Sequence, residues 1–121
     1  MATATRFTIV HTDDLERSGR WALVRRSLEL RSFGANMVEI QPGTQIPEHD
    51  ETERDQEEVF LVLQGDAVAV LDGVRYAAPA GTFVRADPEV VRTIANDSDA
   101  PATVLIVSAP RSSGYEPLDW A

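Results

Sequence analysis

The chain contains no cysteine and no lysine, and it contains two histidines, His11 and His49. Without cysteine there are no disulfide bonds, thiol nucleophiles or thiolate metal ligands. Without lysine there is no Schiff-base chemistry and no lysine general base, and all 11 basic residues are arginine. A metal site that needs three imidazole ligands from one chain is also excluded. Chemistry in this chain must therefore come from carboxylates, arginines and at most two imidazoles.

The chain also lacks a long hydrophobic run and an excess of positive charge. No apolar segment approaches the roughly 20 residues that span a bilayer, and residues 1–6 are polar, unlike the apolar core of a signal peptide. The net charge is −9, from 20 acidic and 11 basic residues, so nucleic-acid phosphates and anionic membranes should repel the chain. We expect a cytoplasmic protein that binds a small-molecule ligand or a second copy of itself, with no nucleic acid and no membrane as partners.

What the sequence does contain is a series of short β-branched and aromatic segments separated by turn-forming residues. In 121 residues this pattern is typical of one all-β domain, a sandwich or a barrel. Asp72-Gly73, between two such segments, is a strong hairpin signal. We expect strands over residues 7–11, 21–31, 36–41, 58–64, 67–71, 74–77, 82–86, 90–95 and 103–108, and one helical turn over 12–16. The polar tail, 111–121, is expected to pack through Tyr115, Pro117 and Trp120 against the domain or another subunit.

Three spacings stand out within this pattern. Gly43 is followed after five residues by His49, Glu58 after six by Gly65, and Arg92 after three by Asn96, itself expected in a turn. Over residues 33–108 this framework resembles the cupin superfamily, in particular its small single-domain members. The resemblance implies an all-β double-stranded β-helix, the cupin jelly-roll barrel, as one domain over residues 1–121. It also implies a homodimer, the usual way for small cupins to cover an open sheet edge.

The same resemblance implies a metal site, from which the sequence departs. The usual ligands are two histidines and a glutamate from the first motif and a histidine from the second. Counted forward from the Pro-Gly turn, the histidine pair becomes His49 and Glu51, and Arg92 stands in place of the last histidine. A register counted back from Glu58 gives no usable pair, so the forward register is preferred.

Arginine cannot ligate a metal, because its guanidinium stays protonated and has no acceptor. We therefore expect Arg92 to replace the metal electrostatically and to pair with Glu58, Glu51 or both. On this hypothesis the ligand pocket consists of His49, Glu51, Glu58, Phe60 and Arg92, and no cofactor is bound.

Two alternatives for the first motif stay open. His49, Glu51 and Glu58 would offer one imidazole and two carboxylates to a divalent ion such as Mn, Fe or Zn. Seven of the eleven residues from 48 to 58 are acidic, however, and such a run is also typical of a solvated loop.

The sequence is compatible with three functions. The first is binding of an unidentified small molecule in the barrel, without catalysis. The second is an enzyme, either a metal-dependent dioxygenase or isomerase using His49, Glu51 and Glu58, or a metal-free acid–base catalyst using His49 and Glu58. The third is a structural or regulatory dimer. A pocket with two titratable groups around one point favours catalysis, a pocket alone favours binding, and a filled barrel favours the structural role.

Overall fold

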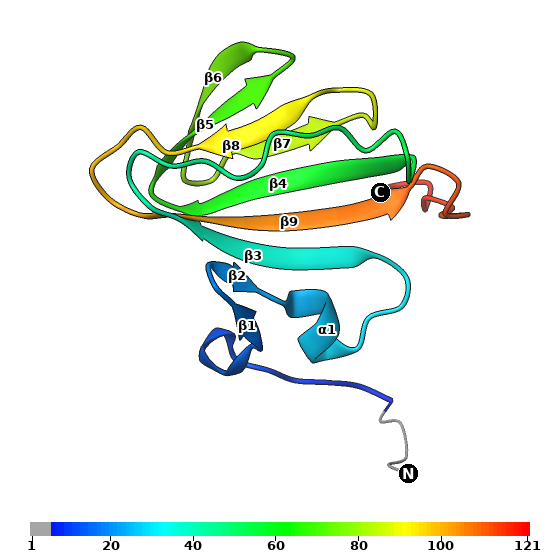
Figure 1. Cartoon of the computed structure of the whole chain (residues 1–121). Coiled ribbons are helices and arrows are strands. Elements are labelled where there is room, and N and C mark those ends of the chain that lie inside the picture. Colours follow the sequence, from blue (N-terminus) through cyan, green and yellow to red (C-terminus); the bar gives the residue numbers. More distant parts are fainter. Residues whose placement is uncertain (1–5) are drawn as a thin grey trace.

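The structure, a computed structural model, describes residues 6–121 and contains two antiparallel β-sheets that face each other (Figure 1). The larger sheet has the strand order β1 (Arg17–Ser18), β2 (Trp21–Ala22), β3 (Gly34–Ile40), β9 (Ala102–Pro110), β4 (Gln56–Gln64) and β7 (Phe83–Ala86). The smaller sheet has the order β6 (Val74–Pro79), β5 (Asp66–Leu71) and β8 (Arg92–Ala95). A 3-10 turn, η1 (Thr12–Asp14), and a short helix, α1 (Val24–Leu28), precede β3. The all-β prediction is confirmed.

The strands predicted from residue 36 onward are all present, as β3 to β9, with small differences in their bounds. The hairpin prediction at Asp72-Gly73 is confirmed as well, since β5 and β6 pair from Leu71 and Val74 outward. Asp72 and Gly73 have φ values of 50° and 81°. The two-residue turn that matches strand twist needs positive φ at both positions, and aspartate and glycine tolerate it.

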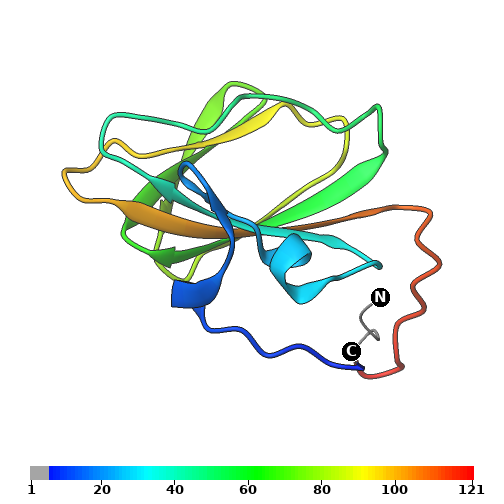
Figure 2. The ribbon, with the colours of Figure 1, turned by 60° about the horizontal axis from the view of Figure 1, so that its bottom comes forward.

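The predicted strand over 21–31 is wrong. After the two residues of β2, the chain turns into α1, which ends at Glu29 in the left-handed conformation. Val24 and Leu28 lie one helical turn apart and are half-buried, whereas Arg25 and Arg26 between them are exposed. This amphipathic spacing, with arginines of high helix propensity, favours a helical turn packed against β3 (Figure 2).

The segments before β1 and after β9 also depart from expectation. Residues 7–11 form no strand, but the predicted helical turn is present as η1, where the Nδ1 of His11 accepts from the N–H of Asp13 at 3.1 Å. The tail leaves the barrel after β9 (Figures 1 and 2), and the side chains of Tyr115 and Trp120 are 75% and 84% exposed. The tail therefore does not pack against the domain, and its contact with another subunit stays a prediction.

Strand register decides which side chains fill the barrel, because directly opposed residues face the same side of a sheet. Across β3, β9 and β4, the register places Val38, Val104 and Val62 side by side in the core. The next inward-facing row is Asn36, Ile106 and Phe60, and the row beyond it is Gly34, Ser108 and Glu58, with Ala86 on β7. One end of the barrel is thus closed by apolar packing, and the other ends in small or polar side chains.

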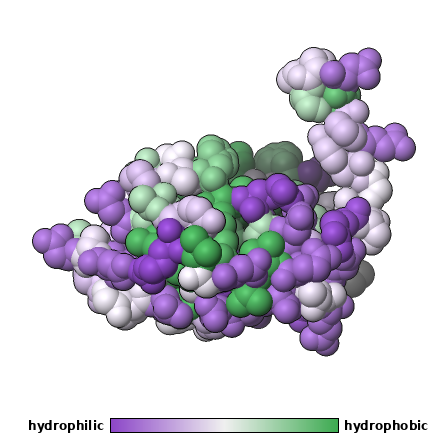
Figure 3. Space-filling model, turned by 90° about the horizontal axis from the view of Figure 1, so that it is seen from above, coloured by the Kyte–Doolittle hydropathy of each residue, from purple (hydrophilic) through white to green (hydrophobic). Residues whose placement is uncertain are grey.

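The outer surface over the smaller sheet mixes apolar and polar groups when seen from above (Figure 3). The edge strand β6 exposes Val74 and Tyr76, each about half accessible. An apolar edge strand of this kind is a suitable surface for a second copy, and the homodimer stays a prediction. Within residues 6–121, no helix combines the length and apolar character needed to cross a membrane.

Candidate functional site

His49 and Arg92 are placed opposite each other by the loop that precedes β4. This loop runs alongside β8 and forms isolated bridges with it, one of which joins His49 to Arg92. The N–H of His49 donates to the carbonyl of Arg92 at 3.1 Å, and the N–H of Arg92 donates back at 2.8 Å. A pair bonded in this way projects both side chains to the same side, here toward Glu58 on β4. The site therefore spans the two sheets.

The ion pair predicted between Arg92 and Glu58 is present inside the barrel. The Nε of Arg92 lies 3.2 Å from the Oε1 of Glu58, the Arg92 side chain is completely buried, and the Glu58 side chain is 9% exposed. Arg92 also donates from Nη1 to the carbonyls of Val90 at 2.6 Å and Pro88 at 3.3 Å. Its Nε is not aligned for a hydrogen bond with Glu58, and its Nη2 has no hydrogen-bond partner within residues 6–121. The pair thus rests on charge rather than on hydrogen-bond geometry.

Glu58 is a carboxyl group that the barrel makes easier to protonate. Burial raises the pKa of Glu58 above its ordinary value of 4.5, and the positive charge of Arg92 offsets this rise only in part. The negative charge of Glu51 raises the pKa of Glu58 further. A buried carboxyl with a raised pKa can donate a proton to a bound molecule, which an exposed glutamate near neutral pH rarely does.

The ring of His49 is oriented by its own loop. Its Nδ1 lies 2.9 Å from the carbonyl of Pro47, which can only accept, so Nδ1 carries a proton. Its Nε2 faces two carboxylates, 3.2 Å from the Oε1 of Glu51 and 3.7 Å from the Oε1 of Glu58. The ligand atoms of these three residues all lie within 4.8 Å of one another. Such a group can exchange a proton with a bound molecule or hold a cation.

An inner cavity of about 210 Å³ opens beside this group. His49 and Glu58 line it together with apolar side chains, among them Trp21, Ile46, Phe60 and Ile106. In the row that contains Glu58, the positions on β3 and β9 are occupied by small residues, Gly34 and Ser108, and both line the cavity. These two residues pack closely, because a Cβ atom on Gly34 would lie only 2.7 Å from the Oγ of Ser108. Although Phe60, Val62 and Ile94 are fully buried, they do not fill the barrel at this end.

An outer cleft of about 620 Å³ adjoins the inner cavity, since the two share several lining residues. Gly34, Asn36, Glu58 and Ser108 line both spaces, so a molecule in the cleft can extend toward Glu58. The cleft is also lined by Glu51 and by three arginines, Arg25, Arg31 and Arg54. The two spaces together form an open pocket at the mouth of the barrel.

The residues predicted to form one pocket lie in three different parts of the site. His49, Glu58 and Phe60 line the inner cavity, and Glu51 lines the outer cleft. Arg92 lines neither space, because its side chain is completely buried behind Glu58. Its influence on a ligand therefore passes through the charge of Glu58.

Two polar residues of the inner cavity, Asn36 and Ser108, are missing from the sequence-based prediction of the pocket, although a pattern in the sequence indicates them. Each ends an alternating row of apolar residues: Val38 and Ile40 follow Asn36, and Ile106 and Val104 precede Ser108. A polar residue on the inward side of a strand indicates where the apolar core stops. No alternating pattern of this kind indicates the arginines of the cleft, because they lie on α1 and on two loops.

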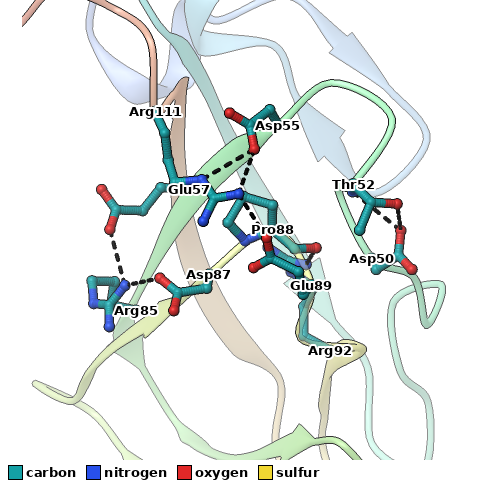
Figure 4. A network of polar contacts seen from close by, with 10 residues as sticks. All are labelled: Asp50, Thr52, Asp55, Glu57, Arg85, Asp87, Pro88, Glu89, Arg92 and Arg111. Carbon is teal, nitrogen blue, oxygen red and sulfur yellow. Dashed lines mark hydrogen bonds and ion pairs between the residues drawn. The ribbon is translucent and has the colours of Figure 1, made fainter.

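The acidic segment before β4 is tied down by contacts of its own (Figure 4). Arg111, just after β9, contacts Asp55 at 2.6 and 3.0 Å and Glu89 at 2.6 Å. Asp50 accepts from the N–H and the hydroxyl of Thr52 at 3.2 and 2.9 Å, and these hydrogen bonds lower the pKa of Asp50. The segment is thus an exposed loop, as predicted, and the ion pairs and hydrogen bonds of Asp50 and Asp55 fix its conformation.

Comparison with known proteins defines the class of this fold and site. Residues 36–108 match the Cupin domain family, and because this is more than half of the chain, the protein belongs to that family. No curated protein matches the chain. The jelly-roll barrel expected from the sequence motifs is therefore confirmed.

Solved structures agree with this assignment. A cupin protein from Bacteroides fragilis is 20% identical, with a TM-score of 0.80 over 97% of this chain and 94% of that one. A cupin-superfamily sugar phosphate isomerase from Silicibacter pomeroyi is 23% identical, with a TM-score of 0.73 over 84% and 75%. A Cupin 2 conserved barrel domain protein from Salinispora arenicola is 18% identical, with a TM-score of 0.66 over 92% and 93%. At these identities the likeness establishes the fold alone.

The residues present do not fit the four-ligand metal site that the cupin resemblance implies. Glu51 takes the place of one histidine, and Arg92 takes the place of another. The guanidinium of Arg92 already faces the Oε1 of Glu58, an oxygen that a metal would need. A cation there would lie beside a buried positive charge, which is unfavourable in a medium of low dielectric constant. His49, Glu51 and Glu58 still converge as three potential ligands for a cation.

Proposed function

We propose that the chain binds a small polar molecule in the inner cavity, recognised by His49 and Glu58 without a metal ion. The supporting observation is a cavity with apolar walls that leads to an imidazole and a protonatable carboxyl. Sites for small molecules are typically apolar clefts with a few convergent polar groups. At about 210 Å³ the cavity is smaller than the roughly 300–1,000 Å³ of sites for drug-sized ligands, so the ligand is a compound of a few carbon atoms.

A substitution that fills the cavity tests this proposal. Ser108 lines both the inner cavity and the outer cleft, so the larger apolar side chain of Ser108→Leu should occupy space that the ligand needs and abolish ligand binding while the barrel stays folded. Binding is measured by NMR titration with small polyols and hydroxy acids, from glycerol to pentoses, following the amides of Phe60 and Ile106. We expect at least one compound to shift these amides in the wild type and none to shift them in the variant.

Val107→Leu is the matched control, because Val107 precedes Ser108 on β9 and faces the opposite side of the sheet. It should leave the titrations unchanged. The proposal is wrong if no compound of the set shifts the amides of Phe60 and Ile106, or if Ser108→Leu binds as tightly as the wild type.

The metal-free part of the proposal has a separate test. Protein purified without a histidine tag or chelator should contain far less than one Mn, Fe or Zn per chain by plasma mass spectrometry. Millimolar Mn²⁺ or Zn²⁺ should also leave the melting temperature nearly unchanged. A cation at a hundredfold excess over its dissociation constant would add about 2.7 kcal/mol of stability. One metal per chain, or a rise of several degrees with one ion, would reinstate His49, Glu51 and Glu58 as ligands.

A second candidate function is a metal-free isomerase of small hydroxy-carbonyl compounds. The observation that favours it is the pair formed by His49 and Glu58, whose Nε2 and Oε1 atoms lie 3.7 Å apart at the cavity wall. Isomerisation through an enediol needs a base that takes a proton from one carbon and returns it to the next, and an acid that protonates the carbonyl oxygen while the neighbouring hydroxyl gives up its proton. An imidazole and a carboxyl that line the same cavity can fill these two roles. The similar structure from Silicibacter pomeroyi is described as a sugar phosphate isomerase. Incorporation of solvent deuterium into a bound sugar, lost in Glu58→Gln, would distinguish the isomerase from a binding protein.

A further inference from the structure

Three arginines at the mouth of the barrel form no ion pair within residues 6–121, although the chain as a whole is acidic. The chain has a net charge of −9. Five arginines form the ion pairs with aspartate or glutamate found within residues 6–121: Arg26, Arg75, Arg85, Arg92 and Arg111. Arg25, Arg31 and Arg54 are in none of these pairs, yet all three line the outer cleft.

Two carboxylates line the same cleft, and one of them is paired with a buried arginine. Glu58 faces the guanidinium of Arg92 at 3.2 Å, whereas Glu51 faces the ring of His49 at 3.2 Å. Arg25 donates one weak hydrogen bond, of 3.4 Å, to the carbonyl of Leu30, and its other N–H groups have no hydrogen-bond partner among residues 6–121. Among the residues that line the cleft, three arginines therefore face one carboxylate, Glu51, that has no arginine partner within residues 6–121.

Three separate elements bring these arginines to one cleft. Arg25 lies on α1, Arg31 lies in the loop between α1 and β3, and Arg54 lies in the loop ahead of β4. The loop with Arg54 is anchored next to it, because Asp55 is held by the guanidinium of Arg111 and accepts at its carbonyl from the N–H of Arg111 at 3.0 Å (Figure 4). At least this side of the arginine cluster is held in place before a ligand arrives, which lowers the entropic cost of binding.

We propose that Arg25, Arg31 and Arg54 bind the anionic group, a phosphate or a carboxylate, of a molecule whose uncharged part enters the inner cavity. Guanidinium groups bind both anions through paired charge-assisted hydrogen bonds. The cleft and the cavity share Asn36 and Ser108, so one molecule can occupy both. This assignment rests on the proposed function for the position of the uncharged part, and it adds the chemical class of the ligand: a small organic anion.

The test is an NMR titration of the full chain with inorganic phosphate and, separately, with acetate, at constant ionic strength held with chloride. We expect saturable shifts of the backbone and Nε–H signals of Arg25, Arg31 and Arg54. The double variant Arg31→Gln/Arg54→Gln should weaken phosphate binding by about tenfold or more, since two charge-assisted contacts are lost. The control Arg17→Gln/Arg75→Gln changes the net charge equally, on arginines that do not line the cleft, and should bind as the wild type does.

Comparing the two anions identifies the charged group of the ligand, and comparing the two sugars tests whether one molecule occupies both spaces. Stronger binding of phosphate than of acetate assigns a phosphate group, and the reverse assigns a carboxylate. Ribose and ribose 5-phosphate then test the two spaces together. Phosphate binding at the arginines, with no shift at Phe60 by either sugar or by any compound of the polyol and hydroxy-acid set, would leave the anion site standing and contradict the proposed function. Absence of saturable shifts at the three arginines, or equal binding by both double variants, overturns the anion site, whatever the sugars do.

Discussion

Replacing Arg92 with leucine is expected to lower the free energy of unfolding by about 3–5 kcal/mol at pH 7, because it leaves Glu58 as a buried charge without a partner. The carbonyls of Val90 and Pro88 lose their donor in the same substitution, at a cost of about 1 kcal/mol or more. Leucine keeps part of the buried apolar volume, so the loss of charge dominates over the formation of a cavity.

The loss of stability caused by Arg92→Leu should become smaller as the pH falls toward 4.5. In the variant, Glu58 can avoid carrying an unpaired buried charge by taking up a proton. Keeping a carboxyl with an ordinary pKa of 4.5 protonated at pH 7 costs up to about 3.4 kcal/mol. In the wild type the raised pKa of Glu58 gives a contribution to stability that is fully present below pH 4.5 and is lost as the pH rises through the raised folded-state pKa. Without Arg92 this pKa rises further, so the decline should extend to higher pH.

Urea unfolding at pH 5 and pH 7.5 measures both effects. Arg92→Leu should lose clearly more stability at pH 7.5 than at pH 5. The double variant Arg92→Leu/Glu58→Leu should recover most of that loss, since replacing a whole buried ion pair by apolar residues is often neutral. A loss below about 0.5 kcal/mol, typical of surface substitutions, or a loss independent of pH would show that Arg92 does not neutralise Glu58.

The second large effect is expected at Asn96, which lies in the turn between β8 and β9 as predicted and is completely buried. Its Nδ2 donates to the carbonyls of Ile40 at 2.8 Å and Ala100 at 2.7 Å, and its Oδ1 accepts from the N–H of Ser98 at 2.9 Å. Asn96→Asp replaces the double donor with an oxygen that faces two carbonyls. We expect a loss of about 3–4 kcal/mol at pH 7, from unsatisfied buried groups and a buried charge.

Thermal and urea unfolding of Asn96→Asp, Asn96→Ala and Ser98→Ala separate these causes. The alanine variant loses the hydrogen bonds without adding a charge, so it should be less damaging than aspartate at pH 7. The two should become similar at acid pH, where the carboxyl is neutral. Ser98→Ala keeps both bonds from Nδ2 and should cost about 1 kcal/mol or less. Equal stability of the aspartate variant and the wild type would mean that the two carbonyls do not depend on Asn96.

Much of this site could be predicted because the two sheets bring widely separated motif residues together in a fixed register. The spacing around His49 and Glu58 carried the cupin resemblance, and the departure at Arg92 was enough to predict its ion pair. The sequence left Glu51 open as a second partner for Arg92, and the structure turns Glu51 toward His49 instead. That choice depends on the conformation of the loop before β4, which no spacing rule contains.

The outer cleft could not be predicted because its residues lie where local patterns are ambiguous. A strand over 21–31 would place Arg25 and Arg26 on opposite faces of a sheet. The short helix instead exposes both, and Arg26 pairs with Glu16 while Arg25 turns to the cleft. Arg54 sits among acidic residues in a turn that ends at Asp55 with a φ of 53°. Its position depends on Arg111, more than fifty residues later, and such long-range contacts leave no local pattern in the sequence.

The stacked rows along β3, β9 and β4 have a consequence for how this protein can diverge. The row that includes Val38, Val104 and Val62 supplies packing, whereas the row that includes Gly34 and Ser108 shapes the cavity. Since distant substitutions act on stability nearly independently, changes in the cavity row can alter which compound fits without loosening the valine core. New specificities are therefore accessible to this barrel through a few point substitutions at its open end, while its fold is inherited unchanged.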